Sequence, residues 1–179
     1  MVPPIPWRER SFRFDLHIGV FPAVWSRLAG MPARAAELVT GQPEAALTAR
    51  PGGKWSSLDH LGHLSELAAL DEIRLEEFLA GVSPLSAADP ENRATWAAAY
   101  DQLAADEVIA PLLAGRRRLV ERLAPLTAAD LARTSVHPRL RQPMRLLDWA
   151  WFVAEHDDHH LAHAALLLGF ADAGATPRA

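Results

Sequence analysis

Along most of the chain, hydrophobic and polar residues recur with the period of an amphipathic α-helix. No segment of the sequence shows the alternation with period two that a half-buried β-strand would require. The first helical stretch spans residues 14–39. The tripeptide Gly30-Met31-Pro32 predicts an interruption in this stretch, and Pro22 predicts either a kink or a later start.

A second helix is expected after residues 41–53, whose glycines, prolines and polar residues are typical of a loop. Ser56 is a good N-cap, and Asp59, three positions later, completes a capping box. This helix should continue to about residue 79 and end at Gly81, because glycine readily takes the left-handed conformation that ends a helix.

A loop at 82–90 leads into a long helical region over 91–123, in which Pro111 predicts a bend or a break. Residues 124–143 contain three prolines and are expected to be irregular, apart from one turn at 128–133.

The last helix is predicted over 145–168 and should end at Gly169. Four principal helices with two long connections are typical of a four-helix bundle, so the predicted fold class is all-α. The sequence contains no internal repeat and no domain linker, and we therefore expect a single domain spanning 1–179.

Composition narrows the class of protein. Half of the residues are hydrophobic, and the net charge of -4 with an isoelectric point near 6.0 argues against a nucleic-acid-binding protein, which normally carries a basic face. No apolar run is long enough to span a membrane, and the N-terminus lacks the apolar stretch of a signal peptide, so we expect a cytoplasmic protein. The absence of cysteine means that any metal must be held by histidine and carboxylate side chains.

Six of the eight histidines lie in two clusters, which are His60/His63 and His156/His159/His160/His163. Two histidines at positions i and i+4 of a helix point the same way, and zinc and nickel favour imidazole ligands. The apolar axis of the last helix is defined by Leu146, Trp149, Val153 and Leu167. At about 100° per residue, His156 and His160 lie within about 20° of this axis, whereas His159 and His163 lie toward its flank. The 156/160 pair is therefore expected to face the bundle interior.

The second helix can supply a third ligand. His63 shares a stripe with Leu67, Leu70 and Phe78, and His60 lies about 60° away at its edge. Asp59, one turn earlier, is expected to accept the free N–H of His63 and so fix its tautomer. A solvent-facing surface rich in histidine and aspartate, with no chemistry, is the alternative that spacing alone leaves open.

Two segments carry a resemblance to a known family. Residues 54–64, KWSSLDHLGHL, and residues 137–162, HPRLRQPMRLLDWAWFVAEHDDHHLA, resemble the two signatures of the DinB-like (DinB/YfiT-like) superfamily, the second in the form of an uncharacterised subgroup. The resemblance implies an up-down-down-up four-helix bundle, often a homodimer. It also implies a divalent metal, usually nickel or zinc, held by three histidines, which carry over to His63, His156 and His160. His163 departs from the family, which often has arginine or glutamine there, so a ligand set that includes His159 or His163 stays open.

Three histidine ligands leave coordination positions open, as in catalytic sites. The resemblance therefore implies a divalent-metal-dependent enzyme, either a transferase acting on a low-molecular-weight thiol or a hydrolase, with a small-molecule substrate. The rival is a non-catalytic metal-binding stress or damage-inducible protein, because no unambiguous general acid or base accompanies the histidines. A DNA-associated role rests only on the family's name, and the acidic isoelectric point argues against it.

Further polar residues allow two interpretations each. His137 or Arg139 could receive an anionic substrate at the mouth of the site, but the sequence favours a structural role for this loop. Glu66, Asp157 and Asp158 could act as a base or support the ligands, or could simply be solvated or cap helices. The run Arg116-Arg117-Arg118 is expected to be a solvated helix face.

Overall fold

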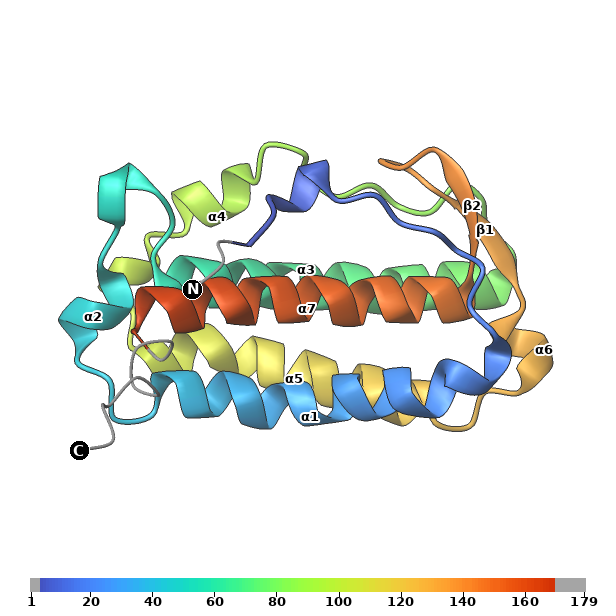
Figure 1. Ribbon diagram of the computed structural model, residues 1–179, viewed down its shortest axis with the longest axis horizontal. Coiled ribbons are helices and arrows are strands. Elements are labelled where there is room, and N and C mark those ends of the chain that lie inside the picture. The colour runs from blue at the N-terminus through green and yellow to red at the C-terminus, as the bar shows by residue number, and fades with distance from the viewer. Residues whose placement is uncertain (1–3, 170–179) are drawn as a thin grey trace, which may run out of the picture.

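Four long helices lie side by side in the computed structural model, which describes residues 4–169 (Figure 1). They are α1 (Phe21–Val39), α3 (Ser57–Ala80), α5 (Ala105–Leu123) and α7 (Leu146–Leu167). Both α1 and α3 pack against α5 and α7. Helices α1 and α7 run in one direction and α3 and α5 in the other (Figure 1), which confirms the predicted up-down-down-up bundle. Within residues 4–169, no helix is both long enough and apolar enough to cross a membrane.

The ends of α3 are set by local chemistry, as the sequence predicts. The Ser56 hydroxyl accepts the backbone N–H of Asp59 at 3.1 Å, and the Asp59 carboxylate accepts the backbone N–H of Ser56 at 2.8 Å. This reciprocal capping box satisfies two donors that the first turn of a helix leaves free. Gly81 then ends the helix with φ of 73°, a left-handed conformation that glycine takes without strain.

Two predicted helix breaks do not occur. Helix α1 begins at Phe21 with Pro22 in its first turn, which is the later start, but it then continues through Pro32. Helix α5 likewise continues through Pro111. A proline inside a helix removes one backbone hydrogen bond, and the packing of the surrounding apolar face offsets that loss, as the buried neighbours of Pro32 indicate.

The connections contain more structure than the sequence predicts. The loop at 41–53 includes α2 (Glu44–Thr48) and the 3-10 helix η3 (Pro51–Gly53). The region 91–123 is not one helix, because α4 (Arg93–Ala97) and the 3-10 helix η4 (Tyr100–Gln102) precede α5, and Ala99 between them has a positive φ of 48°. The expected turn at 128–133 is the short helix α6 (Ala128–Leu131).

A β-hairpin contradicts the prediction that residues 124–143 lack strands. Strands β1 (Thr134–His137) and β2 (Gln142–Arg145) are antiparallel, with Thr134 opposite Arg145. Each strand has only four residues, too few to show a period in the sequence. The hairpin is held by tertiary contacts, since the backbone N–H of Leu85 donates to the carbonyl of Val136 at 3.1 Å.

The N-terminal segment, residues 4–20, runs along the outside of the bundle past α7 (Figure 1). It contains two 3-10 helices, η1 (Trp7–Glu9) and η2 (Ile18–Val20). Phe12 is buried, and its ring lies 4.9 Å from that of Phe152 and 5.0 Å from that of Trp7. We call this segment the N-terminal cover.

An ionic layer divides the apolar core. Arg116 of α5 is 1% exposed and pairs with Asp71 of α3 at 3.0 Å and with Asp157 of α7 at 2.8 Å. One apolar cluster, which includes Leu28 and Trp149, lies on one side of it, and a second cluster, which includes Met31, lies on the other. Burial raises the pKa of Asp157 to about 7, and the Arg116 charge opposes that rise.

The buried ion pairs show that the expectation of a solvated Arg116-Arg117-Arg118 face was wrong for its first member. Arg117 and Arg118 are exposed, as expected. Arg116 differs because its position on the helix faces α3 and α7, where two carboxylates compensate its charge.

We expect Arg116→Met to lower the free energy of unfolding by about 3–5 kcal/mol, because it leaves two buried carboxylates without their cation. Urea unfolding followed by circular dichroism would measure this. Arg117→Met, at the exposed neighbouring position, should change stability by less than about 0.5 kcal/mol. Equal stability of the two variants would show that the ionic layer contributes nothing.

Candidate metal centre

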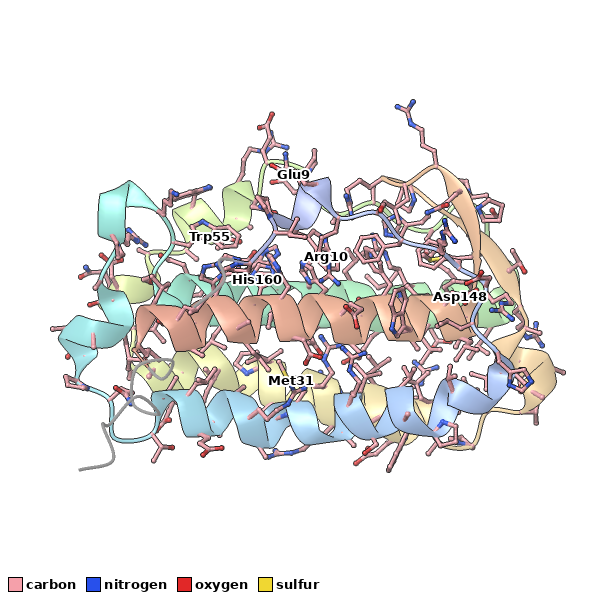
Figure 2. The ribbon with its side chains drawn as sticks, in the orientation of Figure 1. Glu9, Arg10, Met31, Trp55, Asp148 and His160 are labelled. Atoms are coloured by element: carbon pink, nitrogen blue, oxygen red, sulfur yellow. The ribbon has the colours of Figure 1, made fainter. Side chains whose placement is uncertain are left out.

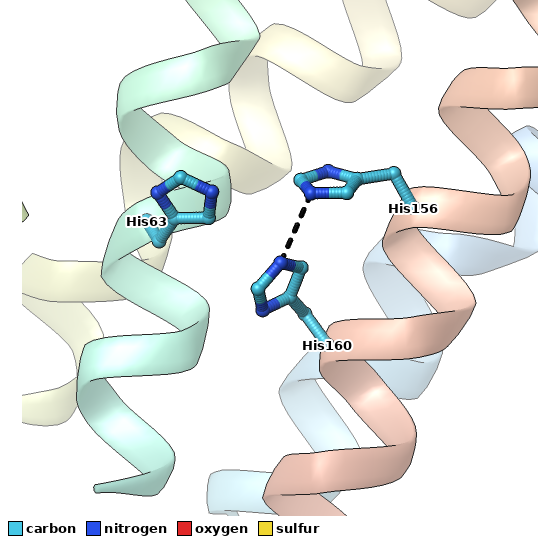
Figure 3. A group of neighbouring side chains, drawn as sticks. All are labelled: His63, His156 and His160. Atoms are coloured by element: carbon cyan, nitrogen blue, oxygen red, sulfur yellow. Dashed lines mark hydrogen bonds between the residues drawn. The ribbon is translucent and has the colours of Figure 1, made fainter. Parts of the chain in front are cut away.

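Three histidines from two helices face one point. His63 of α3 and His156 and His160 of α7 turn their rings toward one another (Figure 3), and one nitrogen from each lies within 4.8 Å of the others. The Nε2 atoms of His156 and His160 are 3.0 Å apart. The structure thus brings together the three residues that helical phase and the family resemblance select.

The site does not lie in the bundle interior, where the phase argument placed it. Asp157 and Leu161 face the core, whereas the 156/160 pair points toward α3 and the outer side of the bundle. Of the residues that define the apolar axis, Leu167 is 36% exposed, whereas Asp157, which was left out of the axis because it is charged, is buried.

Aromatic side chains from outside the four helices cover the histidines. The Trp55 ring lies 5.0 Å from the His63 ring and 5.9 Å from that of His160, and Figure 2 shows Trp55 and His160 on the same side of α7. The Trp7 ring of the N-terminal cover lies 4.7 Å from the His156 ring. As a result, His63 is 6% exposed and His160 is 5% exposed.

Exclusion of water sets the protonation of these rings. Burial lowers the pKa of His63 to about 4. For His156 and His160, burial and then the charges of neighbouring histidines hold the pKa well below its usual range. At neutral pH the three imidazoles are therefore uncharged, and each keeps one nitrogen lone pair that can bind a cation.

A chain of hydrogen bonds orients His63. The Thr95 hydroxyl donates to Glu66 Oε2 at 2.7 Å, and its oxygen lies 3.1 Å from His63 Nδ1. The Tyr100 hydroxyl donates to the other Glu66 oxygen at 2.6 Å. Because the Thr95 proton is committed to the carboxylate, Thr95 accepts the proton of His63 Nδ1. The Nε2 lone pair of His63 is then the one left free, as for a metal-ligating histidine with a supporting carboxylate.

Gly62 leaves space for the Tyr100 ring, which belongs to this series of hydrogen bonds. The Tyr100 ring lies against Gly62, and a Cβ atom there would sit 2.4 Å from the ring. The glycine before His63 therefore has a packing reason, since any side chain would displace Tyr100 and with it the hydroxyl that holds Glu66.

Asp59 does not support His63, which corrects the prediction. Its carboxylate accepts from Arg50 Nε and Nη2, both at 2.8 Å, in addition to capping α3. Asp59 caps the start of α3, as the sequence also indicates, so its carboxylate points away from His63 on the next turn. Glu66, three residues after His63 on the same face, takes the supporting role through Thr95.

His60 supports His160 in a similar way. The two Nδ1 atoms are 2.9 Å apart, so one ring donates to the other. Burial and the charges of nearby histidines lower the pKa of His60 to about 3. The sequence predicts that His60 lies at the edge of the α3 face that carries His63, and in the structure His60 lies beside the three inner histidines.

The remaining histidines of the clusters lie around the site. His163 stacks on His60 with 5.0 Å between ring centres, and the His159 ring lies 4.5 Å from that of His163 and 5.4 Å from that of Trp7. His159 and His163 therefore form the rim of the site and do not face the point shared by the three inner rings.

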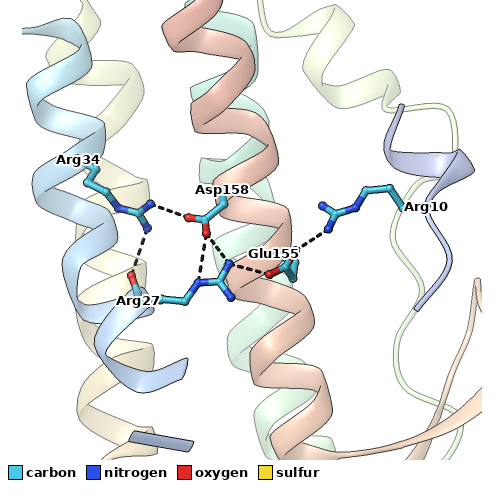
Figure 4. Close-up of polar contacts among 5 residues, drawn as sticks. All are labelled: Arg10, Arg27, Arg34, Glu155 and Asp158. Atoms are coloured by element: carbon cyan, nitrogen blue, oxygen red, sulfur yellow. Dashed lines mark hydrogen bonds and ion pairs between the residues drawn. The ribbon is translucent and has the colours of Figure 1, made fainter. Parts of the chain in front are cut away.

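Ion pairs fasten the N-terminal cover and α1 to α7 (Figure 4). Arg10 of the cover pairs with Glu155 at 2.5 Å, and Arg27 of α1 pairs with both Glu155 and Asp158. Arg34 pairs with the other oxygen of Asp158 at 2.6 Å. Asp157 and Asp158, which the sequence offers as a base or as support for the ligands, are thus both engaged in ion pairs with arginine.

His137 and Arg139 lie apart from the three inner histidines, next to Phe152. The His137 ring centre is 5.1 Å from that of Phe152, and the Arg139 guanidinium lies 5.9 Å from the same ring. His137 Nδ1 accepts the backbone N–H of Leu140 at 3.2 Å, which fits the structural role that the sequence favours.

A cavity of about 400 Å³ opens beside the histidines. Its lining comes from η3, the start of α3 and the end of α7, and consists of Pro51, Gly52, Lys54, Trp55, His60, His163, Leu166 and Leu167. His60 links this cavity to His160, so a molecule in the cavity would lie one imidazole away from the three-histidine point.

The donor set fits a divalent metal ion. Two bonds of about 2.0–2.1 Å at a tetrahedral angle separate two nitrogen ligands by about 3.3 Å, close to the separation of His156 and His160 Nε2. Two imidazole nitrogens at this distance must share either a proton or a cation. With three neutral imidazoles and a carboxylate-supported His63, the donor set could hold a cation and would leave coordination positions open.

Comparisons with known proteins identify the family and a similar fold. The family model of the DinB superfamily matches residues 27–164 of this chain. The fold is similar to that of YfiT from Bacillus subtilis, which is described as a probable metal-dependent hydrolase with an unusual four-helix bundle topology. That match has a TM-score of 0.79 and 20% sequence identity, and it covers 89% of this chain and 91% of the other. A search of curated proteins finds no match.

Sequence reasoning missed Thr95 and Trp7, which contact the histidines. Thr95 lies in a region that was expected to be a long helical stretch with a bend or break at Pro111, and Trp7 precedes the first predicted helix. Neither carries a local signal, because each reaches the site only through the tertiary fold.

We expect Thr95→Val to change the tautomer of His63, because the variant removes the acceptor of its Nδ1–H. Imidazole ¹⁵N NMR should show the Nδ1–H form in the wild type and a mixture of tautomers in the variant. The unsatisfied donor should also lower the free energy of unfolding by about 1–3 kcal/mol. Thr40→Val is the matched control, since the Thr40 hydroxyl is exposed and donates to the carbonyl of Ala36, away from the histidines. An unchanged His63 tautomer in Thr95→Val would contradict the hydrogen-bond chain.

Proposed function

The chain belongs to the DinB superfamily, and from this membership and its three converging histidines we propose that it is a divalent-metal-dependent enzyme of the hydrolase type. The observation that carries the proposal is the set of three neutral imidazoles, two buried and one partly buried, that face one point beside a cavity. Zinc and nickel are the preferred ions, because they favour imidazole nitrogen and the chain has no cysteine.

Each residue of the site has a role in this proposal. His63, His156 and His160 hold the ion, Thr95 and Glu66 orient His63, and His60 orients His160. When bound, such an ion lowers the pKa of a coordinated water and withdraws electrons from a carbonyl or phosphoryl oxygen. The aromatic cover excludes bulk water, which strengthens every electrostatic interaction at the site.

The cavity supports an enzyme over a protein that only stores metal. Its volume suits a small molecule, and its wall combines apolar side chains with Lys54 and two imidazoles. A substrate held there would lie beside His60 and so close to the ligand set. We therefore propose a small organic molecule as substrate.

One observation favours the rival, a metal-binding stress or damage-inducible protein without turnover. The carboxylates near the histidines are all engaged: Glu66 with Thr95 and Tyr100, Glu155 and Asp158 with arginines, and Asp59 with Arg50. A hydrolase could still work through water activated by the ion, without a separate base.

Transfer of a low-molecular-weight thiol is the second reaction type. A bound divalent cation deprotonates a thiol as it does water, so the same three histidines would serve both reactions. The homodimer and the cytoplasmic location remain predictions, the first from the family resemblance and the second from the sequence.

After removal of metal by a chelator, we expect the protein to bind one equivalent of zinc or nickel, as measured by calorimetry and elemental analysis. His63→Ala, His156→Ala and His160→Ala should each abolish stoichiometric binding, because two ligands hold an ion poorly. His17→Ala is the control, since His17 is exposed and lies outside the histidine clusters. Unchanged affinity in His160→Ala, with loss in His159→Ala or His163→Ala, would reject the assigned ligand set.

We expect metal-loaded protein, but not stripped protein, to hydrolyse a small ester such as 4-nitrophenyl acetate. Leu167→Trp should keep the metal and lower turnover at least about tenfold, because the larger side chain fills the cavity. Ile73→Trp is a matched change at an exposed apolar position of α3 outside the cavity lining, and it should leave turnover unaltered. Metal binding without turnover of esters, or of a small thiol with an aryl chloride, would favour the rival.

A further inference from the structure

Hydrogen-bond donors without acceptors gather where the β-hairpin meets α3 and α7. The first is His137, which is 3% exposed. Because its Nδ1 accepts the backbone N–H of Leu140, its proton must be on Nε2. Nε2 is buried, and no acceptor among residues 4–169 contacts it. A buried donor without an acceptor is unfavourable, so an acceptor that binds this nitrogen would stabilise the protein.

The second donor group is the guanidinium of Arg74, a residue that is 6% exposed. Its Nε donates to the carbonyl of Ser86 at 2.9 Å. No carboxylate in the described part of the chain forms an ion pair with it, since Asp71 is bound to Arg116 and Glu77 is bound to Ser86. Within residues 4–169 the terminal nitrogens of Arg74 therefore have no hydrogen-bond acceptor, although buried arginines are almost always paired.

Arg139 brings a third donor group to the same place. Its guanidinium and the His137 ring lie against the same Phe152 ring, and within residues 4–169 it too makes no ion pair. The segment at 82–86 connects the hairpin to Arg74, because the backbone N–H of Leu85 donates to β1 and the carbonyl of Ser86 accepts from Arg74.

The positive charges of this cluster act on one another. Burial and the charges of Arg74 and Arg139 lower the pKa of His137 to about 3. Burial and the charges of Arg8 and Arg74 lower the pKa of Arg139. The carboxylates of Asp71 and Glu77 lie close enough to Arg74 for their charges to act on it, but within residues 4–169 no carboxylate forms an ion pair with Arg74 or Arg139. Such an arrangement is stabilised by a ligand that carries negative charge and several acceptor oxygens.

We propose that Arg74, His137 and Arg139 form a binding site for an oxyanion, either a carboxylate or a phosphate group. The planar guanidinium suits both, because each offers two oxygens to parallel N–H donors. His137 Nε2–H supplies a further donor from a fixed direction, since the bond to Leu140 holds the ring.

This site is separate from the cavity beside the metal centre. His137 and Arg139 both contact the Phe152 ring. That ring lies 5.1 Å from the Trp7 ring, which in turn lies against His156. The oxyanion site is thus one aromatic layer from the histidines, on the side of His156, whereas the cavity lies on the side of His60 and His163. The anion site does not depend on the proposed function, because none of its residues is assigned to the metal.

Binding of inorganic phosphate and of acetate to chelator-treated protein, measured by calorimetry at constant ionic strength, tests the proposal. We expect saturable binding of at least one anion with a stoichiometry of one. A preference for phosphate would identify a phosphoryl group as the natural ligand, and a preference for acetate would identify a carboxylate.

Arg139→Gln should weaken binding at least about tenfold, and because Arg139 is exposed this variant should fold normally. His137→Asn should do the same, since its amide oxygen can still accept from Leu140 while the Nε2 donor is lost. Arg74→Gln is the third variant, and Arg117→Gln, at an exposed arginine of α5, is the control with unchanged affinity. Absence of saturable binding, or binding that Arg139→Gln and His137→Asn leave intact, would overturn the proposal whether or not the protein binds metal.

Discussion

Arg116, placed between Asp71 and Asp157, is the contact on which the arrangement of three helices depends. The guanidinium lies where water cannot replace a lost partner, so a slip of α3, α5 or α7 by one turn would leave buried charges uncompensated. Asp157 directly follows His156 in the sequence. The ion pairs that fix the position of α7 therefore also fix the height at which its two inner histidines meet His63. Apolar packing alone would specify that height less strictly, because one leucine can replace another in a core.

The candidate site is built on the bundle but not inside it. Helices α3 and α7 provide rigid positions for the three inner histidines, while the N-terminal cover, Trp55 and α4 keep water away from them. This division explains why the imidazoles are neutral. Their low pKa values come first from burial, and that burial is supplied by segments that are not part of the four helices. The chemistry of the site thus depends on connections as much as on the bundle.

Local signals made the helices and the three inner histidines predictable. Ser56 with Asp59 marks the start of α3, Gly81 marks its end, and spacing together with the family signature selects His156 and His160 over His159 and His163. What failed needed knowledge of distant contacts. Arg116 reads as a solvated residue until its two carboxylates are placed around it. The strands of the hairpin are too short to show a period, and Thr95 reaches His63 only after the chain between α3 and α5 has turned back over the bundle.

The ionic layer also separates the apolar core into two neighbourhoods, which are the two clusters of buried residues on either side of it. Leu61 and Leu161 belong to the neighbourhood at the cavity end, and Phe78 and Trp149 to the one at the hairpin end. Substitutions that do not touch each other tend to act additively. A lineage of such proteins could therefore reshape the cavity end for a new ligand while the hairpin end kept its packing. The ionic layer between the two clusters would in this way make the two ends free to evolve separately.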